Sequence, residues 1–312
     1  MEKITSVMQI VLPVIIMLLI GVLARKRQFI TDKGIEDMKA LLTNVCIPAV
    51  MFNTFYNARF DSSAGILVLS MAIFTVAAWL LGFVFQKLLR IPQPLAPYLC
   101  TSLEGGMMGY ALFILLFGQE NLYHMALLDL GNALVVFPFF LTKLRMRENA
   151  AGPSRNPFRE LATPINITIA CGLAVNLSGL GSRLAASSID PLVDATLSFL
   201  SGPMSALILL IVGYGLVFKN IQWSETFRTI LARMAVFAAF GIVFYFMISR
   251  AYPNDPIVGY SVIMAFILPP TFMYSVVVKD AKESAYVGSV LAVYTLFSMV
   301  AFGILSWVAV SP

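Results

Sequence analysis

The chain has 312 residues, of which 59% are hydrophobic and only 12% charged, and its mean hydropathy is +0.87. A soluble domain carries about 25% charged residues, so this composition excludes an ordinary soluble protein and predicts an integral protein of the lipid bilayer. The basic pI of about 9.1 does not indicate nucleic-acid binding, because basic residues of a membrane protein mainly set its orientation.

Apolar stretches of about 20 residues, the length that crosses a hydrocarbon core of ~30 Å, follow one another along the whole chain. The first stretch ends in Arg25, Lys26 and Arg27 without a small-residue cleavage pattern, so we expect it to be retained as a span. One longer polar connection, 144–161, predicts a basic cytoplasmic linker at mid-chain. The ten expected spans are 4–24, 37–57, 64–88, 95–118, 122–143, 162–180, 192–218, 227–250, 257–278 and 284–310.

The distribution of positive charge predicts the topology. Of the 21 Lys and Arg residues, all but Lys3, Arg59, Arg183 and Arg250 fall on the side of the linker. Cytoplasmic loops carry an excess of Lys and Arg. We therefore expect a multi-pass protein of the cell membrane, inner or plasma, with both termini outside the cytoplasm.

The linker divides the ten spans into five and five, and an odd number of spans in each half turns the second half upside down relative to the first. The sequence carries faint traces of such a repeat. Pro13 and Gly21 stand eight residues apart in the first span, and Pro164 and Gly172 stand eight apart in the sixth. We expect an all-α membrane protein built from two inverted five-helix repeats. The two expected repeats are 1–143 and 162–312.

The fourth and ninth spans, which hold the same place in the two halves, both contain helix-breaking residues. Three glycines within five residues disfavour a continuous helix in the fourth span. In the ninth span Pro269 and Pro270 remove two backbone donors and clash with the preceding turn. Backbone groups freed in lipid must line a polar cavity or be buried in protein. We expect both helices to be interrupted; the alternative is a simple kink that neighbouring helices repair.

In inverted-repeat transporters the substrate site lies on such interrupted helices, near mid-membrane. The N-termini of half-helices carry partial positive charge and suit an anion such as a carboxylate. We therefore expect backbone N–H groups and small polar side chains at the two interruptions to bind a small organic anion. The expected substrate-binding residues are Ser102, Gly105, Gly106, Gly109, Asn132, Pro269, Pro270 and Thr271.

Two acidic residues lie within predicted spans, Glu104 beside the glycines and Asp129 in the fifth span. An acid inside the membrane is costly unless it is protonated or paired, so both are candidates for proton or sodium coupling. The alternative for Glu104 is a neutral acid that caps a broken helix end. For Asp129 it is a structural hydrogen bond to Asn132 or to a neighbouring helix.

Other activities leave no signature in the chain. There is no phosphate-binding Gly-x-x-x-x-Gly-Lys-Ser/Thr loop, and neither a metalloprotease nor a Ser/His/Asp pattern is present. His124 is the single histidine, which leaves little for acid–base catalysis. We expect neither an enzyme nor a cofactor. The remaining alternatives to a carrier are a membrane sensor and a channel-like protein on the same fold.

Three short motifs occur in the order and spacing of a known family. Asn44 precedes Pro48 and Phe52 in an Asn-x-x-x-Pro-x-x-x-Phe pattern, 106–109 read Gly-Met-Met-Gly, and 268–270 read Leu-Pro-Pro. With these motifs the whole chain resembles the auxin efflux carrier family, as a bacterial-type member. That family is related to the plant auxin carriers and to the group that contains the bile-acid sodium symporters.

The resemblance implies a scaffold domain from spans 1, 2, 6 and 7, with Asn44, Pro48 and Pro203 in it, and a transport domain from spans 3–5 and 8–10. The fourth and ninth spans would cross at the site, and the protein would be a homodimer that works by an elevator-type mechanism. The substrates implied are carboxylates, such as an auxin-like aromatic acid, malate or malonate.

Two positions depart from the family pattern. The plant proteins have a proline directly after the glycine that Gly109 matches, and this chain has Tyr110 there. Glu104 stands where many relatives have a small or amide residue. A carboxylate substrate would be repelled by Glu104 unless this acid is protonated, paired with a cation or turned away.

Overall fold

The computed structural model of the chain describes residues 2–56, 64–148, 164–180, 187, 189–216, 221–253 and 255–309. Every regular element within these ranges is a helix. Seven helical segments are long and apolar enough to cross a membrane, so the chain is an all-α, multi-pass membrane protein, as its composition predicts. They are Val7–Arg27, Asp32–Tyr56, Ala64–Leu88, Gln119–Leu144, Asp190–Gly215, Trp223–Ile248 and Ala281–Ala309.

The other three predicted spans are present as shorter or interrupted helices. The sixth is the 14-residue helix α9 (Pro164–Leu177), the fourth divides into α5 (Ala96–Leu99) and α6 (Tyr110–Phe117), and the ninth divides into α14 (Pro256–Ile267) and α15 (Met273–Val277). The count of ten spans therefore remains a prediction. The predicted linker begins within helix α8, which ends at Glu148, and its remainder lies outside the described residues.

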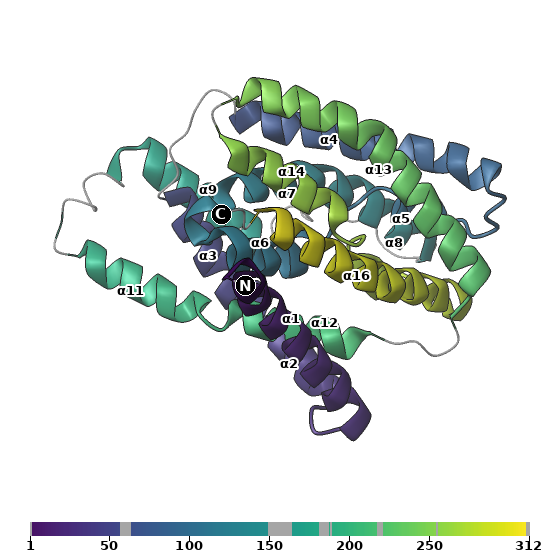
Figure 1. Cartoon of the computed structure of the whole chain (residues 1–312), viewed down its shortest axis with the longest axis horizontal. Coiled ribbons are helices and arrows are strands. Elements are labelled where there is room, and N and C mark those ends of the chain that lie inside the picture. Colours follow the sequence, from purple (N-terminus) through teal and green to yellow (C-terminus); the bar gives the residue numbers. More distant parts are fainter. Residues whose placement is uncertain are drawn as a thin grey trace.

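A first group of helices packs together around α1 and α3. Helix α1 lies against α12, and α3 lies against both α9 and α11. In Figure 1 this group occupies the lower and left parts of the molecule. Its members besides α9 are α1 (Glu2–Arg27), α2 (Asp32–Leu41), α3 (Ile47–Tyr56), α11 (Asp190–Ser201) and α12 (Met204–Gly215).

A second group surrounds the two interrupted helices. Helix α4 lies along α7 and α13, and α14 packs among α7, α13 and α16 (Figure 1). Phe74 of α4 joins three of these helices, because its ring contacts those of Phe237 and Phe266 at centroid distances of 5.2 and 4.9 Å. Besides α5, α6, α14 and α15, the group contains α4 (Ala64–Leu88), α7 (Leu122–Val135), α8 (Thr142–Glu148), α13 (Trp223–Ala251) and α16 (Ala281–Ala309).

Prolines account for two wide helical turns. Pro48 has no N–H to donate to the preceding turn, and the π-helical turn Leu42–Cys46 lies directly before it, between α2 and α3. Pro138 lies within a second π-helical turn, Val136–Leu141, which links α7 to α8. A third π-helical turn, Gly105–Gly109, opens α6, and a short 3₁₀ turn, Gln119–Asn121, precedes α7.

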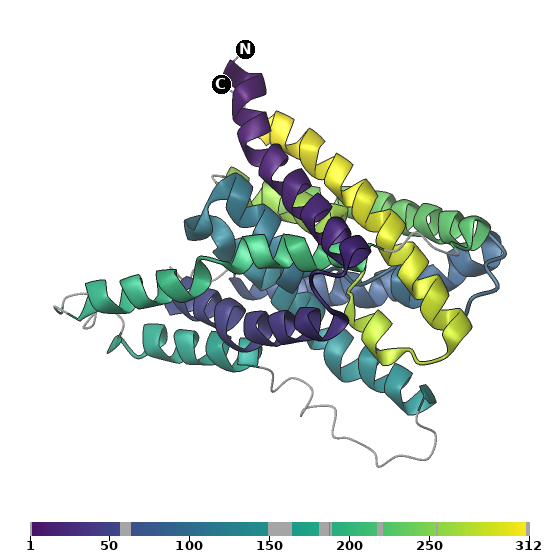
Figure 2. The same ribbon diagram turned by 90° about the horizontal axis from the view of Figure 1, so that it is seen from below.

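The first and last helices lie side by side. Helix α1 packs against α16, and both views show the start of α1 and the end of α16 close together (Figure 2).

The two glycines of the expected repeat have the same structural role. A Cβ atom on Gly21 of α1 would lie 2.2 Å from the Leu210 carbonyl oxygen in α12, and one on Gly172 of α9 would lie 3.0 Å from the Phe52 carbonyl oxygen in α3. In each case the missing side chain lets two backbones of the first group approach closely.

We expect Gly21→Ala to destabilise the protein by about 1–3 kcal/mol, the usual cost of overpacking. Gly303→Ala is the matched control, since a Cβ atom there meets nothing within 4 Å. An alanine at an unobstructed position within a helix is favourable by roughly 0.5–1 kcal/mol, so this control should be neutral or stabilising. Thermal unfolding of the purified variants in detergent measures both, and equal midpoints would contradict the close approach.

Candidate functional site

The first interruption lies between α5 and α6. The chain leaves helical conformation after Leu99 and resumes it at Gly105, and the intervening Ser102 and Glu104 are buried. Gly105 permits close packing, because a Cβ atom there would lie 2.3 Å from the carboxyl carbon of Asp129.

The second interruption follows α14, which ends at Ile267. Leu268 is extended, with φ −69° and ψ 150°, as expected for a residue that precedes a proline. Helix begins again only at Met273, after the two prolines and Thr271. Both predicted interruptions are therefore present in the described helices, the second at the prolines themselves. The first lies at 100–104, directly before the glycines, which form the π-helical turn Gly105–Gly109.

The two interruptions contact each other and are joined by hydrogen bonds from their backbone N–H groups. The N–H of Glu104 donates to the carbonyl oxygen of Pro269 at 2.9 Å, and the N–H of Thr271 donates to the Ser102 hydroxyl at 3.3 Å. Gly109 makes the meeting sterically feasible, because a Cβ atom there would lie 2.6 Å from a methyl group of Leu268. We call this junction, 100–104 with 268–272, the crossover.

Further hydrogen bonds join the crossover and the residue before it, Ile267, to flanking helices. The amide of Asn132 in α7 donates to the Leu103 carbonyl oxygen at 3.3 Å and accepts from the Leu103 N–H at 3.4 Å. The Ser298 hydroxyl of α16 donates to the Ile267 carbonyl oxygen at 2.6 Å. The Thr101 hydroxyl donates to the Thr75 carbonyl oxygen of α4 at 2.5 Å. Asn132, predicted to bind substrate, thus also holds the first interruption.

Arg233 is the principal residue of this site that sequence reasoning misses. Its side chain is completely buried, and its guanidinium donates to the carbonyl oxygens of Leu99 and Leu268, each at 3.0 Å. The guanidinium also lies over the rings of Phe237 and Tyr294, 4.2 and 4.9 Å from their centroids. One side chain therefore joins the helix ends that precede the two interruptions.

The count of positive charge by side groups Arg233 with the helix ends on the linker side, and the side of the membrane on which it lies remains a prediction. The residue lies ten positions into α13, with apolar residues before and after it. A charge within an apolar helix marks a candidate functional position, and this signal was available in the sequence. The charge bias toward the linker side remains a prediction of the topology.

Of the two acids, Glu104 lies within the first interruption and Asp129 packs beside it. Glu104 is 6% exposed, and its Oε2 accepts from the backbone N–H of Phe272 at 2.6 Å. The Asp129 carboxylate packs against Gly105 and accepts from the Tyr110 hydroxyl at 2.7 Å. Glu104 therefore binds the second interruption, and Asp129 binds the start of α6. These bonds fit the structural alternatives for both acids and leave their role in coupling a prediction.

The other predicted residues lie differently. Gly106 borders open space, because a Cβ atom there meets nothing within 4 Å. Asn44 is exposed and donates to the Ala40 carbonyl oxygen of its own helical segment at 2.7 Å. Pro48 is buried, whereas Pro203 is exposed at the turn between α11 and α12. The hydrogen bonds that the described residues make at the crossover include none from these three scaffold positions.

A cavity of about 140 Å³ lies between the two helix groups beside the crossover. Lys39 of α2 lines it, together with residues of α12, α15 and α16 and with Phe272, which precedes α15 and whose N–H binds Glu104. Ser275 and Thr295 belong to the same lining, and their hydroxyls donate to the carbonyl oxygens of Phe272 and Leu291, each at 2.7 Å. Lys39 is half-buried and is the cation of this lining. A positive charge beside so small a space suits an anionic ligand.

Comparison of the chain with models of known protein families finds no match, and comparison with curated proteins finds none either. The resemblance to the auxin efflux carrier family therefore rests on the motifs in the sequence.

We expect Arg233→Met to destabilise the protein more than any exposed charge change on the same helix. The substitution removes both donors to the Leu99 and Leu268 carbonyls, and hydrogen bonds to charged groups are each worth about 1.5–3 kcal/mol. Arg233→Lys should be intermediate, because an ammonium lacks the planar fork that spans two acceptors.

Arg228→Met is the control, since Arg228 is exposed on the same helix and donates only to the Arg90 carbonyl oxygen at 3.3 Å. Thermal unfolding in detergent ranks the three variants. If Arg233→Met unfolds at the same temperature as Arg228→Met, the bridging role is wrong.

Proposed function

We propose that the protein is a secondary carrier that moves a small organic anion, in the first instance a carboxylate, across the cell membrane. The observation that carries the proposal is the crossover itself, where two interrupted helices meet within a bundle of apolar helices. Non-helical backbone at membrane depth is tolerated only where it is buried in protein or lines a cavity. Interrupted helices that meet in this way are the usual substrate site of inverted-repeat transporters.

The proposed architecture is ten spans in two inverted repeats, with the termini on the same side. Three features support it. The paired residues Gly21 and Gly172 make equivalent close contacts, the ends of α1 and α16 lie together, and the interruptions hold the same place in each half. The excess of Lys and Arg on the linker side supports an extracytoplasmic position for both ends.

We propose an elevator-type movement of the second helix group, as the transport domain, against the first group as the scaffold. The hydrogen bonds at the crossover support this division. Thr75, Asn132, Arg233 and Ser298, which hold the interruptions, all belong to helices of the second group. The crossover can therefore move with that group without exchanging these bonds.

We further propose that the carrier is a homodimer formed through the first group. The described part of that group presents large apolar side chains outward, with Phe199 86%, Leu177 71% and Leu192 68% exposed. These side chains suit contact with either lipid or a second copy of the chain, and dimerisation is the arrangement that the family resemblance implies.

The proposed entry for the anion is the cavity between the groups, where Lys39 supplies the positive charge. Glu104 lies next to this cavity through its bond to Phe272 and opposes a second negative charge. A proton or a sodium ion that neutralises Glu104 would remove this repulsion. Coupling of anion transport to proton or sodium movement is therefore part of the proposal.

Counterflow in proteoliposomes tests the carrier directly, with a panel of radiolabelled mono- and dicarboxylates. A carrier exchanges internal for external substrate, so labelled acid should accumulate transiently against unlabelled acid inside. Lys39→Met should raise the concentration for half-maximal exchange about tenfold, which corresponds to about 1.4 kcal/mol of binding free energy.

Lys33→Met is the matched control, because Lys33 is exposed on the same helix and does not line the cavity. Equal effects of the two variants would contradict the role of Lys39. No counterflow with any acid, from protein that remains folded, would instead support a sensor without carrier activity.

We expect Glu104→Gln to abolish the pH or sodium dependence of uptake while the protein remains folded. The glutamine retains a carbonyl oxygen that can accept from the Phe272 N–H, but it can neither bind a proton nor carry charge. Uptake is measured across a series of pH values and sodium concentrations, with the exposed Glu120→Gln as control. An unchanged dependence on both ions would exclude Glu104 from coupling.

A further inference from the structure

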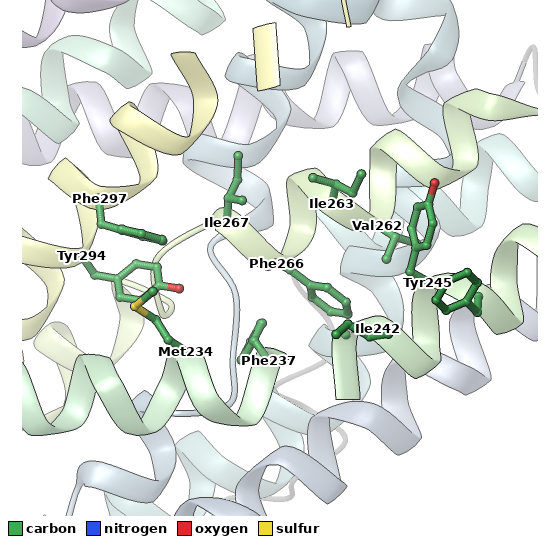
Figure 3. Close-up of a pocket in the computed structure, with 12 residues that line it drawn as sticks. Met234, Phe237, Ile242, Tyr245, Val262, Ile263, Phe266, Ile267, Tyr294 and Phe297 are labelled. Carbon is green, nitrogen blue, oxygen red and sulfur yellow. The ribbon is translucent and has the colours of Figure 1, made fainter. Parts of the chain in front are cut away.

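A second cavity, separate from the one beside Lys39, lies on the outer side of α13, α14 and α16. Its volume is about 420 Å³, within the ~300–1,000 Å³ range of small-molecule sites. The side chains that line it are apolar or aromatic, and Figure 3 shows that its polar atoms are the hydroxyls of Tyr245 and Tyr294. We call it the lateral groove.

The lateral groove opens toward the space that hydrocarbon occupies. Its rim includes Ile242 and Phe246 of α13, whose side chains are 60% and 63% exposed. Both lie within Trp223–Ile248, one of the segments long and apolar enough to cross a membrane. Molecules that reach this opening therefore come from within the bilayer.

The shape of the groove favours a chain-like occupant. Along α13 it extends from Met234 to Phe246, a separation of twelve residue steps that covers ~18 Å at a rise of about 1.5 Å per residue. That length is more than half of a hydrocarbon core of ~30 Å. A carboxylate placed against this lining would lose its hydration without a charged partner, so the groove suits hydrocarbon and not the proposed substrate.

Residues next to the crossover form the inner wall of the groove. Phe266 and Ile267 line it and immediately precede the second interruption, and Tyr294 lines it while its ring packs against the Arg233 guanidinium. Gly241 leaves room beside Phe266, because a Cβ atom there would lie 3.0 Å from that ring. An occupant of the groove therefore contacts residues that fix the crossover.

We propose that the lateral groove is a binding site for one acyl chain of a bilayer lipid, held along α13 behind the crossover. The chain fills a volume that the protein's own side chains leave open, and it packs against Phe237, Phe266 and Tyr294. Binding of the lipid does not depend on transport, so the site can be tested even if the proposed function is wrong.

Photo-crosslinking tests the proposal with the full chain in phosphatidylcholine vesicles that contain a phosphatidylcholine with a diazirine in its acyl chain. After irradiation, adducts are mapped to residues by mass spectrometry. We expect labelling of groove residues such as Ile263 and Phe246 to exceed that of exposed α4 residues such as Leu69, which is 63% exposed. Equal labelling of the two surfaces would mean bulk lipid only and would overturn the proposal.

Ile242→Trp should fill the groove from its rim and lower adduct yield within it by about tenfold. Val243→Trp is the matched control, because Val243 is the next residue on α13, is 65% exposed and does not line the groove. Equal loss in both variants would contradict the site. If a soluble aromatic acid binds in the groove and no lipid labels it, the groove is a site for another class of ligand. That result would also contradict the proposal.

Discussion

The structure depends on one constraint, the need of unwound backbone inside a membrane to find hydrogen-bond partners in the protein. Each interruption supplies hydrogen-bond partners to the other. The N–H of Glu104 donates to the carbonyl oxygen of Pro269, and the Glu104 carboxylate accepts from the N–H of Phe272. This pairing requires the two segments to lie within hydrogen-bonding distance, and Gly109 permits it because a Cβ atom there would lie 2.6 Å from a methyl group of Leu268. Gly105 instead makes room for the Asp129 carboxylate of α7, so the two glycines admit different neighbours of the first interruption.

Arg233 extends the same constraint to the helix ends before the interruptions. A guanidinium is the side chain best suited to bind two acceptors at once, and here it binds the carbonyl oxygens of Leu99 and Leu268. Burial of a charge is expensive unless it is hydrogen-bonded or paired. Besides the two carbonyls, the rings of Phe237 and Tyr294 stabilise the charge through cation–π contacts. The arginine can thus remain inside the bundle although no acid among the described residues is its direct partner.

The sequence predicted the features that depend on local chemistry. Clustered glycines at 105–109 and adjacent prolines at 269–270 weaken a helix locally, so the second interruption could be located at the prolines and the first to within a few residues of the glycines, at 100–104. The partners of the interruptions could not, because Asn132, Ser298 and Arg233 reach them only through tertiary packing. The count of charges by side also did not single out Arg233, because it groups every arginine with the nearer loop whatever the side chain contacts. The shared spacing of Gly21 and Gly172 hinted at a repeat, and their close contacts with α12 and α3 supply the physical reason for it.

The crossover has unlike surroundings on its two sides, and this difference bears on how a carrier could use it. The small cavity with Lys39 lies toward the first helix group. The lateral groove, with its apolar and aromatic lining, lies toward the outside. An anion has a charged partner only on the first of these sides, so that is where substrate would bind. The hydrogen bonds that hold the interruptions come from the second group, whereas the Lys39 side of the cavity belongs to the first. Movement of one group against the other would therefore change the surroundings of the anion while the crossover itself stayed intact, which is what alternating access by an elevator requires.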